Sequence, residues 1–487
     1  MGKTRREVDS LGELEVPNEA YYGAQTVRAI DNFAISGIQI GHLSQLIEAL
    51  GIVKKASVQA NAKLGDISAD KASAIAAACD DVIDGKMAAE FPIDVFQGGA
   101  GTSTNMNINE VIANRALERM GLSRGRYDVI HPNDDVNLSQ STNDVYPTAI
   151  RLAILSAHQS LDQQLRHLAD ELDRKGTEFA SVLKLGRTQL QDAVPMTLGQ
   201  EFSAFAVTMR EDVMRLQELV ALFREVNLGG TAIGTGINTK RDYAGLVVQE
   251  LSQLTGQRFV LATNLIEACW DTGAFVLFSG MLKRTATKLS KISNDLRLLS
   301  SGPRGGLAEI NLPPLQPGSS IMPGKVNPVI PEVVNQVAFQ VIGADLTITL
   351  AAEAGQLQLN VMEPIIAYSM LQSISLLTNA ARVLREKCIV GITANEERCR
   401  EHLEASTAVV TALTPLIGYE RASSVAKATL KSGQNVWDVL QAELRLTPEF
   451  LSQLRDPSTL TKPWKAQKLA ASTCSAEPGG KIGLDAR

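Results

Sequence analysis

One stretch near residue 150 constrains the fold more than any other, because its apolar side chains follow a helical repeat. They recur at the i, i+3 and i+4 spacing that places side chains on one face of an α-helix. A long helix with a continuous apolar face needs neighbouring helices to cover that face, so the repeat predicts a helical bundle. The residues that carry it are Ile150, Ala153, Ile154, Ala157, Leu161, Leu165, Leu168 and Leu172.

Similar patterns continue on both sides of this stretch. No segment shows sustained alternation of period two, and the aromatic content of 5% is low for a β-sandwich. The sequence therefore predicts an all-α fold. We expect Gly176 to close the first helix as its C-cap. Further helices are expected at about 43–63, 70–83, 109–119, 198–226, 240–254, 267–300, 329–353 and 365–388.

The lengths of these patterns predict three domains. We expect a mainly helical domain at 1–142 and a long helix-bundle domain at 143–395. Shorter patterns predict a small helical domain at 396–487, and its last residues, 471–487, are expected to be mobile because they are rich in Gly, Ser and charge. A short hairpin is expected in the irregular arm at 4–37.

Composition excludes several classes of protein. The net charge of −6 offers no basic face for nucleic acid, and any anion site must therefore be built locally. The five cysteines are scattered without a Cys-x-x-Cys pair, which argues against a disulfide framework or a zinc site. Residues 1–9 contain no apolar run, and no later run approaches ~18 residues. We expect a cytoplasmic protein that does not enter a membrane.

Four polar segments share an unusual composition. They are rich in Ser, Thr, Asn, Gln and Gly, whose hydroxyl, amide and backbone N–H groups bind carboxylates without a metal. Taken singly, 139–143 reads as a helix N-cap and 97–107 as a plain glycine loop, but the coincidence of four favours a site for a small molecule with more than one carboxylate. The four segments are 97–107, 139–143, 186–192 and 317–327.

Several familiar motifs are absent or incomplete. Residues 318–325 have five residues between the glycines of a phosphate loop instead of four, and Val326 stands where a magnesium-binding hydroxyl should follow. The glycine-rich segment 229–236 does not follow a predicted strand, so a dinucleotide site is not expected. The five histidines show no metal-ligand spacing. We therefore expect no metal site.

The segment 318–328, Gly-Ser-Ser-Ile-Met-Pro-Gly-Lys-Val-Asn-Pro, resembles the signature of the aspartase/fumarase superfamily. Segments 101–107, 139–144 and 186–193 reinforce the resemblance, which runs from about residue 5 to about 465. It implies three mostly helical domains with a central five-helix bundle. It also implies a homotetramer in which each active site is built from three subunits.

Within the superfamily, the chain is most similar to the branch that deaminates L-aspartate. Ser141-Thr142-Asn143 and residues 354–364 match that branch, and Gln189 stands where fumarate hydratases have a histidine. Water leaves poorly as hydroxide and needs a general acid, whereas an ammonium group leaves as neutral ammonia. Residues 23–26 and Gly324 resemble hydratase usage, so fumarate hydratase, acting on fumarate and malate, is the alternative.

The resemblance also implies roles for individual residues. Ser319 would remove a Cβ proton from L-aspartate, giving an aci-carboxylate carbanion, before ammonia leaves and fumarate forms. The resemblance assigns the β-carboxylate to Thr102, Ser141, Thr142 and Ser320, the α-carboxylate to Thr188, Lys325 and Asn327, and the amino group to Thr102, Asn143 and Gln189.

This chemistry requires no cofactor, and activation by a divalent cation such as magnesium cannot be read from the sequence. The expected partners are the dicarboxylate substrate and further copies of the chain. The sequence also leaves room for a lyase that acts on larger succinyl-linked substrates, and for a structural protein that has lost catalysis. The presence of Ser319, Lys325, Asn327 and Thr188 argues against a purely structural protein.

Overall fold

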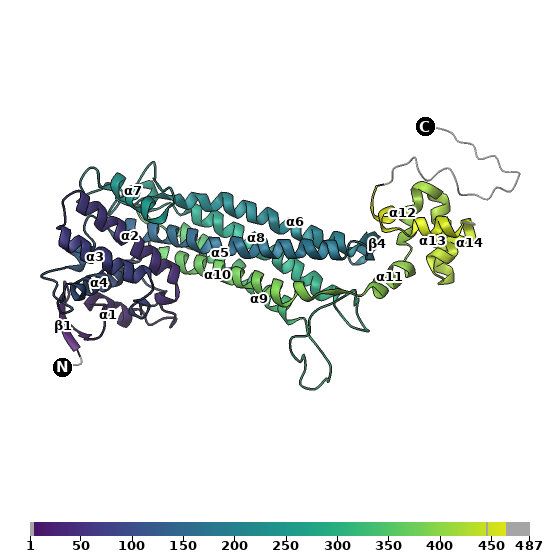
Figure 1. Ribbon diagram of the computed structural model, residues 1–487, viewed down its shortest axis with the longest axis horizontal. Coiled ribbons are helices and arrows are strands. Elements are labelled where there is room, and N and C mark those ends of the chain that lie inside the picture. The colour runs from purple at the N-terminus through teal and green to yellow at the C-terminus, as the bar shows by residue number, and fades with distance from the viewer. Residues whose placement is uncertain (1–3, 445–446, 464–487) are drawn as a thin grey trace. The chain divides into compact units, whose positions relative to one another are not determined.

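The computed structural model describes residues 4–444 and 447–463 (Figure 1). The segment 471–487, which we expect to be mobile, lies outside the described residues. The described residues fall into two compact units, and the three-domain division stays a prediction. The first unit comprises the described parts of Met1–Arg166, Glu211–Leu289 and Asn335–Ala381, and the second those of His167–Arg210, Ser290–Val334 and Arg382–Arg487.

Helices dominate both units, and the predicted all-α class is confirmed. Five helices of 23 residues or more contribute segments to both units. Their apolar faces supply a large share of the buried side chains, as the helical repeat predicts. They are α5 (Thr142–Glu178), α6 (Leu198–Val220), α8 (Gly273–Leu299), α9 (Val329–Glu353) and α10 (Glu363–Lys387).

The first unit also contains shorter helices and two small sheets. Helices α2, α3 and α4 pack against one another, and α7 packs against α2 (Figure 1). The predicted hairpin is present as the antiparallel pair β1–β2, and β5 pairs in parallel with β6. The bounds are β1 (Thr4–Asp9), β2 (Gly12–Pro17), α1 (Ala24–Asn32), α2 (Ser44–Lys63), α3 (Ala69–Ile83), α4 (Thr102–Arg119), β5 (Glu225–Val226), α7 (Tyr243–Thr255) and β6 (Val260–Leu261).

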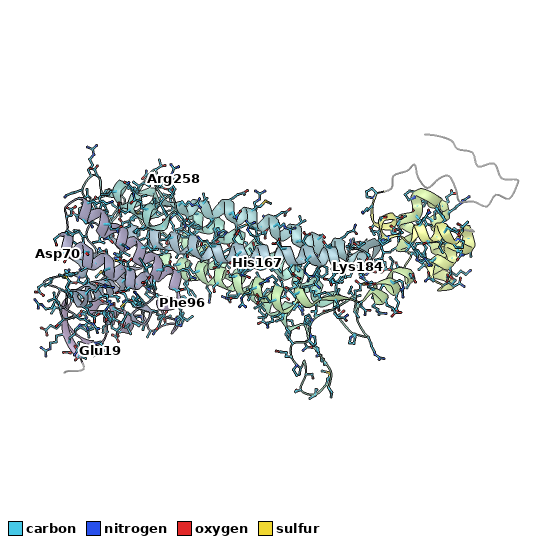
Figure 2. All side chains as sticks on the ribbon, viewed as in Figure 1. Glu19, Asp70, Phe96, His167, Lys184 and Arg258 are labelled. Atoms are coloured by element: carbon cyan, nitrogen blue, oxygen red, sulfur yellow. The ribbon has the colours of Figure 1, made fainter. Side chains whose placement is uncertain are left out.

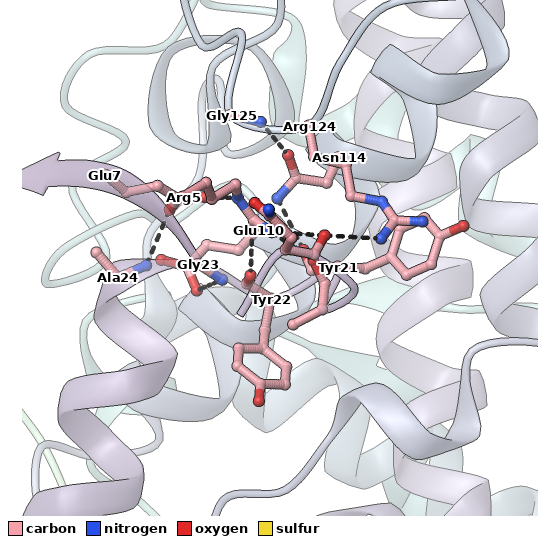
Figure 3. Close-up of polar contacts among 12 residues, drawn as sticks. Arg5, Glu7, Tyr21, Tyr22, Gly23, Ala24, Glu110, Asn114, Arg124 and Gly125 are labelled. Atoms are coloured by element: carbon pink, nitrogen blue, oxygen red, sulfur yellow. Dashed lines mark hydrogen bonds and ion pairs between the residues drawn. The ribbon is translucent and has the colours of Figure 1, made fainter. Parts of the chain in front are cut away.

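Buried carboxylates attach the amino-terminal arm to the helices of this unit (Figure 3). Glu110 of α4 accepts a hydrogen bond from Gly23 N at 2.7 Å, and Glu7 of β1 accepts one from Ala24 N at 3.0 Å. Arg5 holds the Glu7 carboxylate through an ion pair of 2.8 Å. Both carboxylates therefore lie at the N-terminus of α1, where unpaired backbone N–H groups favour negative charge.

The second unit contains two antiparallel pairs, β3–β4 and β7–β8, and the carboxy-terminal helices. These helices surround a buried apolar cluster that includes Trp437 and Leu440, and Leu185 of β3 belongs to the same cluster. The bounds are β3 (Leu183–Thr188), β4 (Gln191–Thr197), β7 (Ile310–Asn311), β8 (Thr393–Ala394), α11 (Glu396–Ala405), α12 (Ala408–Ile417), α13 (Tyr419–Ser432), α14 (Val436–Leu444), α15 (Pro448–Leu454) and α16 (Pro457–Thr461).

Three local expectations are wrong. Helix α4 begins at Thr102, within the segment expected to be a loop, and 186–192 forms the tip of the β3–β4 hairpin. Gly176 does not end α5, which continues to Glu178. The reason is packing: a Cβ atom on Gly176 would collide with the Ser203 side chain of α6. That glycine permits close approach of two helices.

Helix α9 is long and apolar enough to cross a membrane by length and composition. The sequence shows no apolar run of this length here, because Glu332 and Asp345 interrupt it. Core helices of globular proteins pass the same test, so the finding is weak evidence for a membrane span.

Replacing Phe223 by Ala should destabilise the first unit. The Phe223 side chain is 0% exposed and packs against Phe275 and Phe278, with ring centroids 5.3 Å away in each case. Truncating a buried Phe typically costs about 3–5 kcal/mol. Denaturant unfolding at fixed protein concentration measures the change. The neighbouring Leu222, 43% exposed, is the control, and Leu222→Ala should cost much less. Equal losses would contradict this packing.

Candidate active site

Thr102 is the first residue of α4, and the backbone before it explains its position. Gly101 has a φ of 87°, and a Cβ atom at that residue would collide with the ring of Tyr146. Only glycine satisfies both restrictions. Thr102 is therefore presented at a helix N-terminus, where unpaired N–H groups attract anions.

The segment Ser141–Asp144 caps helix α5, as the sequence predicts. Ser141 Oγ accepts a hydrogen bond from Asn143 N at 3.3 Å, and Asp144 Oδ1 accepts one from Ser141 N at 2.9 Å. This reciprocal arrangement is a capping box with Asp in place of Glu. Thr142 lies between the two capping residues and is buried. One segment therefore caps the helix and also carries predicted substrate-binding residues, so the helix-cap interpretation does not exclude a role in binding.

The buried Asp144 carboxylate also fixes a second loop. Its Oδ2 accepts hydrogen bonds from Gly229 N at 2.9 Å and Thr231 N at 3.0 Å. Asn143 Nδ2 donates to Ala232 O at 2.7 Å. The glycine-rich segment 229–236, where the sequence predicts no dinucleotide site, thus has a structural role. It supports the residues that precede α5.

A buried lysine lies behind Thr142, and the sequence did not reveal it. The Lys54 side chain is 0% exposed, and its Nζ donates to Asn137 Oδ1 and Gln140 Oε1 at 2.9 Å each. Asn105 Nδ2 donates both to Asn137 Oδ1 and to Thr142 Oγ1, at 3.1 Å each. A continuous hydrogen-bonded chain therefore joins the lysine to a predicted substrate-binding residue.

Two features of the sequence could have indicated this network. Four asparagines occur in α4, and all of them are buried. A buried amide must find hydrogen-bond partners, so such a helix requires a polar interior. Lys54 itself interrupts an apolar helical pattern. The four asparagines are Asn105, Asn107, Asn109 and Asn114.

Thr188 and Gln189 lie at the tip of the β3–β4 hairpin in the second unit. Thr188 ends β3, while Gln189 and Leu190 connect the strands with φ angles of 54° and 60°. Two successive left-handed residues form the type of turn that matches the twist of paired strands. All three side chains are exposed. The turn exposes a hydroxyl and an amide.

The signature segment forms a loop that is closed at its base. Gly318 N donates to Lys325 O at 2.7 Å, and Asn327 Nδ2 donates to Gly318 O at 2.8 Å. A Cβ atom on Gly318 would lie 2.8 Å from Lys325 O, so this close approach requires glycine. Ser320 and the Lys325 side chain are exposed along the loop.

The Ser319 hydroxyl lies among backbone donors. Its Oγ accepts hydrogen bonds from Ile321 N at 3.2 Å and Met322 N at 3.1 Å. Such donors stabilise negative charge on an oxygen atom. The structure thus supplies the N–H groups that a serine base would need.

The predicted site residues form three groups. Ser141, Thr142 and Asn143 share one hydrogen-bonded network in the first unit, where Thr102 begins α4. Ser319, Ser320, Lys325 and Asn327 share the signature loop, and Thr188 and Gln189 share the hairpin turn. The assembly of these groups into one site stays a prediction.

No candidate metal site is visible in the part of the chain that the structure describes. There, no group of three or more His, Cys, Asp or Glu side chains is arranged to hold a metal ion.

Comparison with known proteins identifies the family. The family described as "Lyase" matches residues 12–343, and "Fumarase C C-terminus" matches residues 409–462. The aspartate ammonia-lyase of Pseudomonas canavaninivorans is 60% identical over 460 residues, covering 94% of this chain and 97% of that protein. That of Escherichia coli (strain K12) is 53% identical over 466 residues, covering 95% and 98%.

Solved structures agree with this result. A fumarate lyase:delta crystallin from Brucella melitensis bound to cobalt has a TM-score of 0.92 and 59% identity, covering 94% of this chain and 100% of that one. A class II fumarase from Schistosoma mansoni has a TM-score of 0.86 and 38% identity, covering 93% and 98%. The chain therefore belongs to the aspartase/fumarase superfamily of lyases, as the signature segment predicts.

Replacing Lys54 by Met should change how stability depends on pH. Burial lowers the pKa of Lys54 from 10.5 to about 7, although nearby Asp144 opposes the shift. Between pH of about 7 and 10.5, Lys54 therefore carries a proton in the unfolded chain but not in the folded chain. Stability should rise with pH in that window for the wild type relative to Lys54→Met, by up to about 1.4 kcal/mol per pH unit.

Denaturant unfolding of both proteins at several pH values, at one protein concentration, measures this difference. Lys55→Met is the matched control, because the Lys55 side chain is partly exposed and pairs with Asp80 at 2.6 Å. A constant difference between wild type and Lys54→Met would contradict the lowered pKa.

Proposed function

We propose that this enzyme is an aspartate ammonia-lyase, which converts L-aspartate reversibly to fumarate and ammonia. The observation that carries the proposal is Gln189 at the exposed hairpin tip, in a chain 53–60% identical to aspartate ammonia-lyases over nearly its whole length. A glutamine amide can contact an ammonium group but cannot protonate a leaving hydroxide. The enzyme is a carbon–nitrogen lyase.

In the proposed mechanism, the oxygen of Ser319 removes a proton from Cβ of L-aspartate. The electron pair of the C–H bond passes into the β-carboxylate, giving an aci-carboxylate. This pair then forms the Cα–Cβ double bond, and the Cα–N bond breaks with its electrons leaving on nitrogen. The products are fumarate and neutral ammonia. The N–H groups of Ile321 and Met322, or alternatively the Lys325 ammonium, would stabilise the serine alkoxide.

The remaining site residues bind the substrate in this scheme. Negative charge grows on the β-carboxylate in the transition state, so donors at that group contribute to the rate as well as to binding. The hydrogen-bonded chain from Lys54 orients Thr142 for this task. We assign the β-carboxylate to Thr102, Ser141, Thr142 and Ser320, the α-carboxylate to Thr188, Lys325 and Asn327, and the amino group to Thr102, Asn143 and Gln189.

We also propose a homotetramer in the cytoplasm, with each active site shared between subunits. The support is an apolar stripe on α9, exposed between 37% and 63% along its length. Contiguous exposed apolar surface of this kind marks a contact between proteins. The stripe consists of Phe339, Ile342, Leu346 and Leu350.

Fumarate hydratase is the second candidate, because the Schistosoma mansoni fumarase shares the fold at 38% identity. The forward reaction separates the two functions. Purified enzyme should release fumarate and ammonia from L-aspartate in equal amounts and should leave L-malate unchanged. Consumption of L-malate without turnover of L-aspartate would favour the hydratase.

Ser319→Ala should abolish turnover while the fold is retained, because no base would remain to remove the Cβ proton. The decrease in kcat should exceed the factor of about 10²–10³ that the loss of one oxyanion donor causes. Steady-state assays of fumarate release test this. Leu315→Ala, just outside the loop, is the control and should keep near-normal kcat. Near-normal turnover by Ser319→Ala would remove Ser319 as the base.

Lys325→Ala should mainly weaken substrate binding, because it removes a charge from the α-carboxylate. We expect KM for L-aspartate to rise by a larger factor than kcat falls, since charge on that carboxylate changes little during the reaction. The same assay measures both constants. An unchanged KM would contradict the role of Lys325.

A further inference from the structure

A buried carboxylate in the second unit gathers three basic side chains. Glu309 is 0% exposed, and its oxygens lie 2.7 Å from Arg187 Nη1, 3.0 Å from Lys184 Nζ and 3.0 Å from His402 Nδ1. Lys184 (labelled in Figure 2) also pairs with Glu201 at 2.6 Å. Burial raises the pKa of Glu309, but the basic partners outweigh burial and the pKa is lowered. The carboxylate is therefore ionised, and each of its oxygens takes part in an ion pair.

The backbone of Glu309 is held as firmly as its side chain. Glu309 N donates to Leu299 O, and Asn395 N donates to Glu309 O, at 2.9 Å each. The next two residues form β7, which pairs with β8 just before α11. The following segment, 312–317, contains three prolines and leads directly into the signature loop. Glu309 therefore lies where the chain enters that loop.

Its partner Arg187 lies two residues before Gln189. The turn formed by Gln189 and Leu190 is strained, because side chains other than Gly and Asn lose about 1–2 kcal/mol per residue in the left-handed region. Such conformations persist only where the surroundings enforce them. The ion pair from Arg187 to Glu309 anchors the end of β3 next to this turn.

We infer that Glu309 is a positioning residue, which holds the Gln189 turn in place for the amino group of the substrate through Arg187. The identity of that substrate, L-aspartate, rests on the proposed function. Glu309 does not contact the substrate itself. It joins two of the predicted site groups mechanically, because its side chain holds the hairpin and its backbone precedes the signature loop. His402 extends the same connection to α11.

The test compares Glu309→Gln with a variant that relieves the strain. Glu309→Gln should lower kcat/KM for L-aspartate by about 10-fold or more and should speed deuterium exchange of the backbone amides at 188–191. Leu190→Gly removes the Cβ atom that opposes a left-handed turn. Alone, Leu190→Gly should change kcat/KM by less than about 3-fold. Combined with Glu309→Gln, it should recover at least half of the decrease in kcat/KM, measured on a logarithmic scale.

Glu201→Gln is the matched control, because it removes a partner of Lys184 without touching Arg187. It should leave both the exchange rates at 188–191 and kcat/KM near wild type. If Glu309→Gln does not fold, Arg187→Lys should reproduce its effects, since lysine lacks the second donor arm of arginine. Unchanged exchange in the variant that folds, or no rescue by Leu190→Gly, would overturn the inference.

Deuterium exchange needs no substrate, so this readout separates the two proposals. A wild-type enzyme that ignores L-aspartate would overturn the proposed function alone. The exchange rates of Glu309→Gln and of its Leu190→Gly combination would still decide whether Glu309 holds the turn.

Discussion

The hydrogen bonds and ion pairs of buried carboxylates hold the polar segments of this enzyme in place. Asp144 accepts N–H groups from Ser141, Gly229 and Thr231, and so joins a helix start to a loop more than eighty residues later. Glu309 does the same in the second unit with cationic side chains. A buried carboxylate is costly unless it is paired with cations or hydrogen-bond donors, so these residues fix the geometry around them.

This arrangement explains how irregular segments can carry precise chemistry. The residues proposed to contact substrate are mostly exposed or half-buried hydroxyls and amides, which would otherwise be mobile. The structure supports them from behind with buried polar groups that do not react, namely Lys54 behind Thr142 and Glu309 beside the hairpin. Positioning by a rigid second layer of contacts is how proteins bring weak donors into productive geometry.

The long helices could be predicted because their apolar repeat is local, as in 150–172. The hairpin could not, because Gln189 and Leu190 are poor turn residues and their conformation depends on tertiary contacts. Ser319 and Lys325, by contrast, could be predicted, because the Pro and Gly pattern and the family signature of their segment are visible in the sequence. The sequence could hint at a buried Lys54 but not at its contacts, because its partner Asn137 is 83 residues away.

The choice of leaving group distinguishes an ammonia-lyase from a hydratase, and a single competition experiment decides between them. Fumarate supplied with ammonium in water offers the enzyme both nucleophiles at once, with water in great excess. Proton NMR of the products then reports which of them the site accepts. We expect aspartate as the product and no malate. Malate as the main product would contradict it, and would show that a site with Gln189 still activates water.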